Sequence, residues 1–203
     1  ETGPYGGYAF GAVLVYEGSA QGEYYQGDEV AISGYGNEYF GLTEMEPHNG
    51  NAINLIGFGN DLPSPERINT RLLADDTLND GDSRFGEAYE SVWVKSWPSA
   101  VIDTLGYGEY LISDTEARAD SVEVDPAIEL TYVPAIGDLI TVEGYMDYDY
   151  GAYQISPVAD QFVVLIGHVA VEDLPTVVKA GGFESIYPNP FNPSTTISYS
   201  LPA

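Results

Sequence analysis

The sequence predicts an all-β fold, with two small tandem barrels followed by an extended C-terminal tail with one strand. The first observation is a repeat, because Gly27–Tyr35 returns as Gly137–Tyr145. The second is composition: 17 tyrosines, 23 glycines and 13 prolines are spread along 203 residues, as short strands joined by many turns require. The third is that no segment of ten or more residues has helical periodicity.

The repeated stretch begins with Gly-Asp, a turn signal. Apolar residues then alternate with polar ones at Val30, Ile32 and Val142, the period of a half-buried strand. Two copies in one chain predict two related β-domains. We expect a first barrel over residues 1–73, an acidic linker over 74–88, a second barrel over 89–168 and an extended tail over 169–203.

Short strands are predicted throughout both halves. In the first half they are Ala12–Tyr16, the repeated strand, Leu42–Glu46 and Ala52–Ile56, and residues 66–73 fit either a short helical turn or an extended connector. In the second half they are Tyr89–Trp97, Gly108–Ser113, Asp120–Asp125, Leu139–Tyr145, Ala152–Ser156 and Gln161–Ile166. Five or six short strands per unit is the size of a small closed barrel.

Aligning the repeats exposes a missing strand. Ala12–Glu17 corresponds to Asp120–Asp125, 108 residues later, and two strands near 89–102 and 108–113 precede the second of these segments. Shifted back by 108, the first of those strands falls before residue 1. The first barrel is therefore expected to lack its opening strand and to expose unpaired backbone groups, which invite another strand.

The tail contains a candidate donor strand with clean alternation. It could enter its own first barrel or that of a neighbour, and donation that does not close on itself builds a filament. Self-association is therefore expected. The donor residues are Thr195, Thr196, Ile197, Ser198, Tyr199, Ser200 and Leu201.

Charge excludes several partners. Six basic residues stand against 32 acidic ones, a net charge of −26. Phosphate backbones and anionic membranes would be repelled, so nucleic acid is not an expected partner. No run of about 18 apolar residues is present, so membrane insertion is not expected either. A strongly acidic exterior is typical of a secreted protein.

Catalytic patterns are lacking. The chain has no cysteine and two histidines, His48 and His168. It contains no Gly-x-Ser-x-Gly or His-x-x-x-His motif, and no carboxylate pair stands out from the many present. We therefore expect a protein that is not an enzyme. The chain begins at Glu1 without methionine, as a processed product or a fragment would.

One acidic segment matches part of a calcium loop, and calcium is the only cofactor considered. With Asp76 at position 1, Asp80 stands at 5 and Glu87 at 12, whereas Leu78 stands where an oxygen ligand belongs. A solvated acidic linker is the alternative interpretation. The candidate ligands are Asp76, Asp80, Asp82 and Glu87.

Aromatic residues cluster after the repeated strand in each half of the chain. Aromatics there can stack on sugars or bases, and without basic partners we expect a glycan, a protein contact or ordinary packing rather than nucleic acid. The residues are Tyr35, Tyr39, Phe40, Tyr145, Tyr150 and Tyr153.

Four segments carry a resemblance: Glu87–Val94, Gly106–Asp114, Tyr132–Asp138 and Tyr148–Pro157. Together they resemble the OB-fold modules of secreted bacterial proteins, including those beside extracellular endonuclease/exonuclease/phosphatase domains. The first half is similar to the module that usually precedes these, and the resemblance covers about residues 4–166. It implies two OB-like barrels and no catalytic motif.

The segment Ile186–Pro202, with its Pro-Asn-Pro-Phe-Asn-Pro run, resembles the opening of the C-terminal sorting domain of type IX secretion cargo. This resemblance implies export to the cell surface or the medium. The sequence thus favours a secreted, non-catalytic structural protein that assembles by β-strand complementation from its tail. The alternatives are a glycan- or calcium-binding module and an accessory domain of a secreted nuclease.

Overall fold

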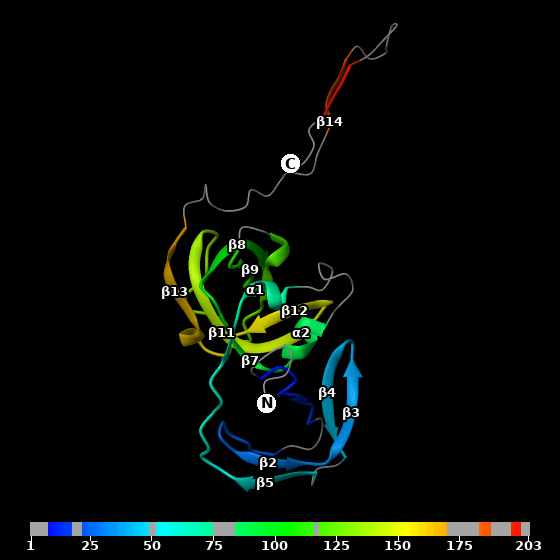
Figure 1. The fold of residues 1–203 in the computed structure, drawn as a ribbon, viewed down its shortest axis with the longest axis vertical. Coiled ribbons are helices and arrows are strands. Elements are labelled where there is room, and N and C mark those ends of the chain that lie inside the picture. The colour runs from blue at the N-terminus through cyan, green and yellow to red at the C-terminus, as the bar shows by residue number, and fades with distance from the viewer. Residues whose placement is uncertain are drawn as a thin grey trace.

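The structure is a computed structural model that describes residues 8–17, 22–48, 52–74, 84–115, 118–169, 183–187 and 196–199. These residues form mainly β-strands with two short α-helices, which confirms the all-β prediction (Figure 1). Neither helix is long and apolar enough to cross a membrane.

The second barrel is a closed ring of strands. β8 pairs with β9, β9 with β10, β10 with β12, β12 with β11, and β11 returns to β8. All these pairs are antiparallel except β10–β12, and β7 extends the pairing along β11. The strands are β7 (Trp93–Ser96), β8 (Ser99–Gly106), β9 (Glu109–Ser113), β10 (Val122–Val124), β11 (Asp138–Asp149) and β12 (Ala152–Ser156).

Alternation along these strands builds the core. Val94, Val101, Ile112, Val142 and Ile155 are fully buried and belong to one hydrophobic cluster. Two 3₁₀ turns, Arg118–Asp120 and Asp160–Phe162, connect strands at the periphery, and β13 (Val163–His168) pairs with β11.

The segment before this barrel also belongs to it. β6 (Glu66–Ile68) pairs in parallel with β7, and α1 (Thr70–Leu73) and α2 (Arg84–Tyr89) bury Leu73 and Tyr89 in the same cluster. The structure therefore corrects the expected boundary: residues 66–73 lie with the second barrel rather than the first. The physical reason is burial of their apolar side chains.

The N-terminal part, called the first unit below, comprises β1 (Leu14–Val15), β2 (Glu29–Ile32), β3 (Gly34–Tyr39), β4 (Leu42–Pro47) and β5 (Ile53–Gly57). β4 lies between β1 and β3, whereas β2 pairs with β5. No ring closes among the described strands of this unit. In place of the expected first barrel, the described part of the chain has two small sheets that do not close into a ring.

The first unit repeats part of the second barrel residue for residue. Tyr35 pairs with Glu46 as Tyr145 pairs with Ser156, and five of the six β3–β4 partner pairs have a β11–β12 counterpart 110 residues later. The parallel β1–β4 pair matches β10–β12, with an offset of 109 rather than the 108 expected. β5 matches β13, and both pairings carry a register shift at the same place.

The Gly-Asp turn has the same geometry in both copies. Gly27 and Gly137 have φ of 89° and 94°, a region that favours glycine. Asp28 accepts a hydrogen bond from the Tyr25 N–H, and Asp138 accepts one from the Ala135 N–H, both at 2.9 Å. This turn starts the long strand at the same register in each unit.

The tail contains two strands rather than the one expected. β14 (Phe183–Tyr187) pairs antiparallel with β15 (Thr196–Tyr199), so the predicted donor strand has a partner in its own tail. Thr195, Ser200 and Leu201 lie outside the described residues. The hairpin lies beyond the second barrel, at the end of the molecule opposite the first unit (Figure 1).

Candidate functional site

The open side of the first unit is the strongest candidate site. In the second barrel, β9 pairs with β10, and β7 and β8 pair with β11. The corresponding edges of the first unit are those of β1 and of β2–β3, and neither has a partner strand there among the described residues. Two unpaired edges therefore face a gap in the sheet.

Backbone groups at one of these edges can be located from the repeat. In the second barrel the Met146 N–H donates to the Val92 carbonyl, and the Met146 carbonyl accepts from the Ser91 N–H at 2.7 Å. Gly36 occupies the register position of Met146. Its N–H and C=O therefore face the gap, where an added strand would satisfy them.

Apolar side chains line the gap. Val13 is 44% exposed, whereas Val122, at the same register position in the second barrel, is 1% exposed. Met45 is half-buried, whereas its counterpart Ile155 is fully buried. We call this set the open seam; its members are Val13, Val15, Val30, Ile32 and Met45.

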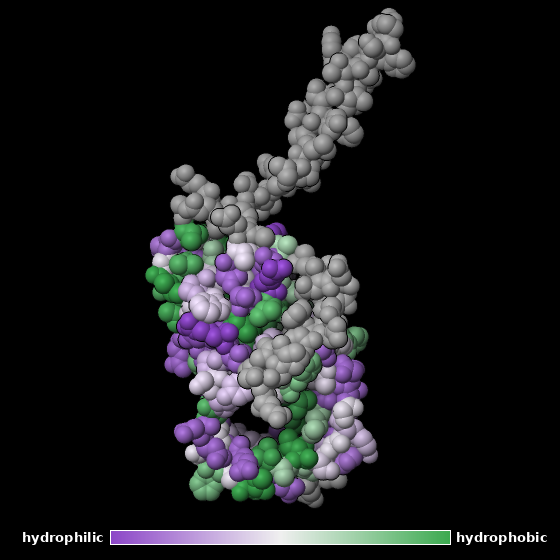
Figure 2. Space-filling view, viewed as in Figure 1, coloured by the Kyte–Doolittle hydropathy of each residue, from purple (hydrophilic) through white to green (hydrophobic). Residues whose placement is uncertain are grey.

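The space-filling view agrees with an incomplete first unit. Figure 2 shows an opening through the part of the molecule that holds this unit, with hydrophobic residues on part of its rim. Leu55 and Ile56 on β5 are exposed too, but so are their counterparts Leu165 and Ile166 on β13 of the closed barrel, so the contrast between the units rests on Val13. An exposed apolar region of this kind marks an interaction surface more often than ordinary solvent contact.

The first unit is held against the second barrel by a buried carboxylate. Glu90 accepts a hydrogen bond from the Thr43 N–H at 3.1 Å, while its Oε1 has no hydrogen-bond partner. Burial raises the pKa of Glu90 to about 7, and the nearby charge of Glu87 acts in the same direction. Sequence reasoning missed this residue, because nothing in its local pattern distinguishes it from the other acidic residues.

The β3–β4 turn makes a second contact between the two units. A Cβ on Gly41, whose φ is 101°, would meet the ring of Tyr148 in β11. Glycine is thus required there both for the backbone conformation and for the close approach. Together with Glu90, this contact fixes β4 against the second barrel and leaves the opposite side of the sheet open.

The aromatic residues considered as a binding face lie in different surroundings. Tyr35 is exposed and contacts His48 edge-on, with ring centroids 4.1 Å apart. Tyr39 and Phe40 form a similar pair at the β3–β4 turn, and Tyr150 is fully exposed at the β11–β12 turn.

The two remaining aromatic candidates are less accessible. Tyr145 is half-buried, and Tyr153 is buried in the barrel core, where its hydroxyl donates to Glu87 at 2.8 Å. Of the aromatic set, Tyr35 lies on β3, the strand that borders the open seam.

Three of the four candidate calcium ligands, Asp76, Asp80 and Asp82, lie outside the described residues. Glu87 is described, and its carboxylate accepts the hydrogen bond from Tyr153. Among the described residues, no group of three or more His, Cys, Asp or Glu side chains is arranged to hold a metal ion.

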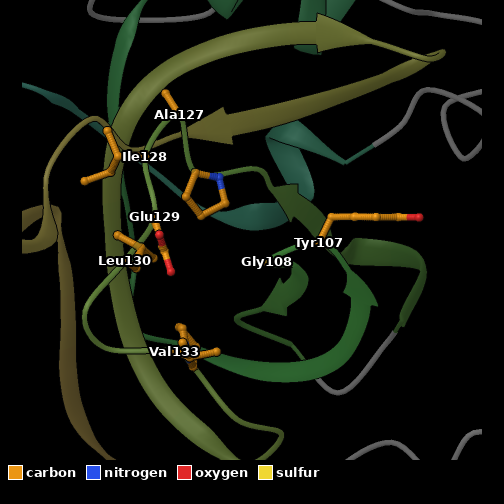
Figure 3. A pocket seen from close by; sticks show the side chains of 9 residues that line it. Tyr107, Gly108, Ala127, Ile128, Glu129, Leu130 and Val133 are labelled. Carbon is orange, nitrogen blue, oxygen red and sulfur yellow. The ribbon is translucent and has the colours of Figure 1, made fainter.

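A cavity of about 570 Å³ opens at one end of the second barrel, between the β8–β9 turn and residues 126–134. Figure 3 shows Ile128, Leu130 and Val133 around it, with the Tyr107 ring directed away. Glu129 is the one charged residue of its lining. Ligand sites combine apolar walls with several convergent polar groups, and this cavity offers few of them.

Comparisons with protein-family models, with curated proteins and with solved structures find no match for this chain. The assignment of function therefore depends on the geometry of the site itself.

Proposed function

We propose that the protein is a non-catalytic structural subunit of an extracellular assembly. In that assembly the C-terminal tail of one copy completes the first unit of another by strand pairing. The observation that supports this most is the contrast between the two units. They share one register, yet in the first unit both edges lack partner strands among the described residues, and Val13 of the seam is exposed whereas its counterpart Val122 is buried.

Two free-energy gains favour a first unit whose edges are paired by added strands over one whose edges stay in water. Each unpaired backbone group at a covered edge gains a hydrogen bond worth about 1 kcal/mol net. Covering the open seam adds about 25 cal/mol per Å² of apolar surface removed from water. The first gain requires strands, because a ligand without a backbone ladder would leave the edges unpaired.

The proposed extracellular location rests on two features of the sequence. The net charge of −26 suits a soluble surface, and the tail resembles the opening of a type IX sorting domain. Labelling of intact cells with antibodies against the second barrel tests the location: surface signal is expected, and signal only after lysis would contradict it.

The assembly itself is tested by light scattering and negative-stain imaging of the full chain and of a chain that ends at Gly182. The full chain should form particles much larger than its 21.9 kDa subunit, and the shortened chain should remain monomeric. A full chain that stays monomeric at every concentration, or a shortened chain that assembles equally well, would overturn the proposal.

A matched pair of point variants separates loss of assembly from loss of folding. Val13→Asp places a charge in the open seam, whereas Val133→Asp places one at an exposed position of the second barrel. The first variant should prevent assembly and keep the thermal unfolding of the second barrel. The second should assemble normally, and assembly that is equally impaired in both would speak against the seam.

A further inference from the structure

We infer that the gap in the first unit accepts the whole β14–β15 hairpin of a second copy, and not a single tail strand. The inference rests on the proposed function and specifies its partner segment. It departs from the expectation of one donor strand, Thr195–Leu201, because the structure pairs Thr196–Tyr199 with Phe183–Tyr187.

The second barrel indicates how many strands the gap holds. Between β10 and β11 its ring contains two strand positions, occupied by β9 and by the bent strand β7–β8. The corresponding edges, those of β1 and of the β2 part of β2–β3, are therefore three strand spacings apart, or about 14 Å, because β8 pairs with the part of β11 that corresponds to β2. One strand can pair with only one of these edges, so a single donor would leave the other edge open.

Direction and length also fit a hairpin. β8 runs antiparallel to β11, β9 runs antiparallel to β8, and β10 runs antiparallel to β9. The occupants of the gap must therefore be antiparallel to each other, as β14 and β15 are. β14 has five residues, the same length as β9, and the four residues of β15 would cover part of the position that the eight-residue β8 holds beside β9.

Charge favours this segment over most of the chain. Glu184 is the one charged residue between Phe183 and Tyr199, in a protein with a net charge of −26. A nearly neutral hairpin can approach an acidic subunit with little repulsion. It brings a single charge, that of Glu184, to the apolar seam.

The position of the hairpin favours a second copy over the same chain. The hairpin lies at the end of the molecule opposite the first unit (Figure 1). A donor at one end and an acceptor at the other produce a head-to-tail contact, which repeats without closing unless the rotation between copies forms a ring.

Cross-linking between different chains tests the inference, because the protein has no cysteine and each introduced cysteine is unique. Leu14→Cys marks the β1 edge, and Gly36→Cys marks the β3 edge, where an added Cβ meets no atom within 4 Å. Ile186→Cys marks β14 and Ser198→Cys marks β15. Each edge variant is co-expressed with each tail variant, treated with a short bis-maleimide and analysed by mass.

The hairpin predicts that one tail strand links to Leu14→Cys and the other links to Gly36→Cys, in products that contain two chains. Links from β15 alone, or links to one edge alone, would overturn the hairpin and leave donation by the tail intact. An assembly that forms without any of these links would overturn both. A further chain carries both Leu14→Cys and Ile186→Cys, and cross-links that form only within this single chain would contradict donation to a second copy.

Proline variants give an independent readout. Ser185→Pro in β14 and Ser198→Pro in β15 each remove a backbone donor, so both should abolish assembly. Ser194→Pro, between the two strands, is the matched control and should assemble normally. Assembly that survives Ser185→Pro but not Ser198→Pro would show that β14 is dispensable and would overturn the hairpin.

Discussion

The first unit and the second barrel follow one register over four strand positions, yet they differ in what surrounds those strands. In the second barrel β7, β8 and β9 pair with the edges of β10 and β11 and complete the ring around the apolar core. In the first unit the same faces border the open seam. The turn residues and the alternation are alike in the two units, so local sequence determines the register, whereas burial depends on strands supplied from elsewhere.

The largest expected effect comes from truncating the side chain at the same register position of each unit and comparing the losses of stability. Ile155→Ala in the second barrel should cost about 2–5 kcal/mol, because the side chain is fully buried. Met45→Ala, at the matching position of the half-covered first unit, should cost clearly less in the monomeric chain that ends at Gly182. Urea unfolding of both variants measures the difference. Equal losses would mean that the two cores are equally packed.

Two glycines at matching positions offer a second comparison. A Cβ on Gly144 would meet the Ser156 carbonyl oxygen, and one on Gly34 would meet the Glu46 carbonyl oxygen. Gly144→Ala should destabilise the protein by about 1–3 kcal/mol, because the closed ring cannot shift. Gly34→Ala should cost less, since the described strands of the first unit do not close into a ring and β3 can shift toward the gap. Thermal unfolding of both variants measures the two losses of stability. Equal losses would mean that the first unit is as rigid as the closed barrel.

The contact between the units should depend on pH. The folded-state pKa of Glu90, about 7, lies above its ordinary value of 4.5, so the folded protein binds more protons than the unfolded chain between these values. Stability should therefore fall as pH rises through that window. Glu90→Gln should flatten the profile and raise stability at pH 8 by on the order of 1–2 kcal/mol.

The matched control for this pH dependence is Glu129→Gln, an exposed position in the second barrel. It should leave the profile unchanged. If Glu90→Gln and the unsubstituted protein lost stability in parallel between pH 5 and 7, another group would have to be responsible.

The smallest effect is expected at an ion pair that only the closed barrel has. Lys95 Nζ lies 3.0 Å from Glu143 Oε2, and the Trp93 Nε1–H donates to the other oxygen at 2.9 Å. Lys95→Met should cost less than about 1 kcal/mol, and the loss should shrink at high salt. A loss of several kcal/mol in urea unfolding would indicate that this pair helps to hold the ring closed.

The repeat was readable from the sequence because turn chemistry is local. Gly27 and Gly137 mark the same turn, and alternation after each predicts the strands that the structure contains. The first strand of the repeat has an offset of 109 residues, whereas the strands after the Gly-Asp turn have an offset of 110. The reason is that the segments between the first strand and the two Gly-Asp turns differ in length by one residue.

Other elements could not be read in this way, because long-range contacts define them. Residues 66–73 join the second barrel through burial of Ile68 and Leu73, two apolar positions too few to show a period. β14 was overlooked because Phe183–Tyr187 lies in a segment rich in proline and glycine, which indicated a connector. The role of Glu90 depends on Thr43, 47 residues away.

Ser33 interrupts the long strand of the first unit, whereas its counterpart β11 runs unbroken over 12 residues. Amide hydrogens on the water-facing side of the interrupted strand, such as that of Gly36, should exchange with deuterium rapidly in the single subunit. Those of Met146 and its neighbours, already bonded across the ring, should exchange slowly. In the proposed assembly, deuterium uptake at the Gly36 amide would therefore report what fraction of the first units is paired with a tail hairpin. The Met146 amide would serve as the internal reference, and the protein would need no label.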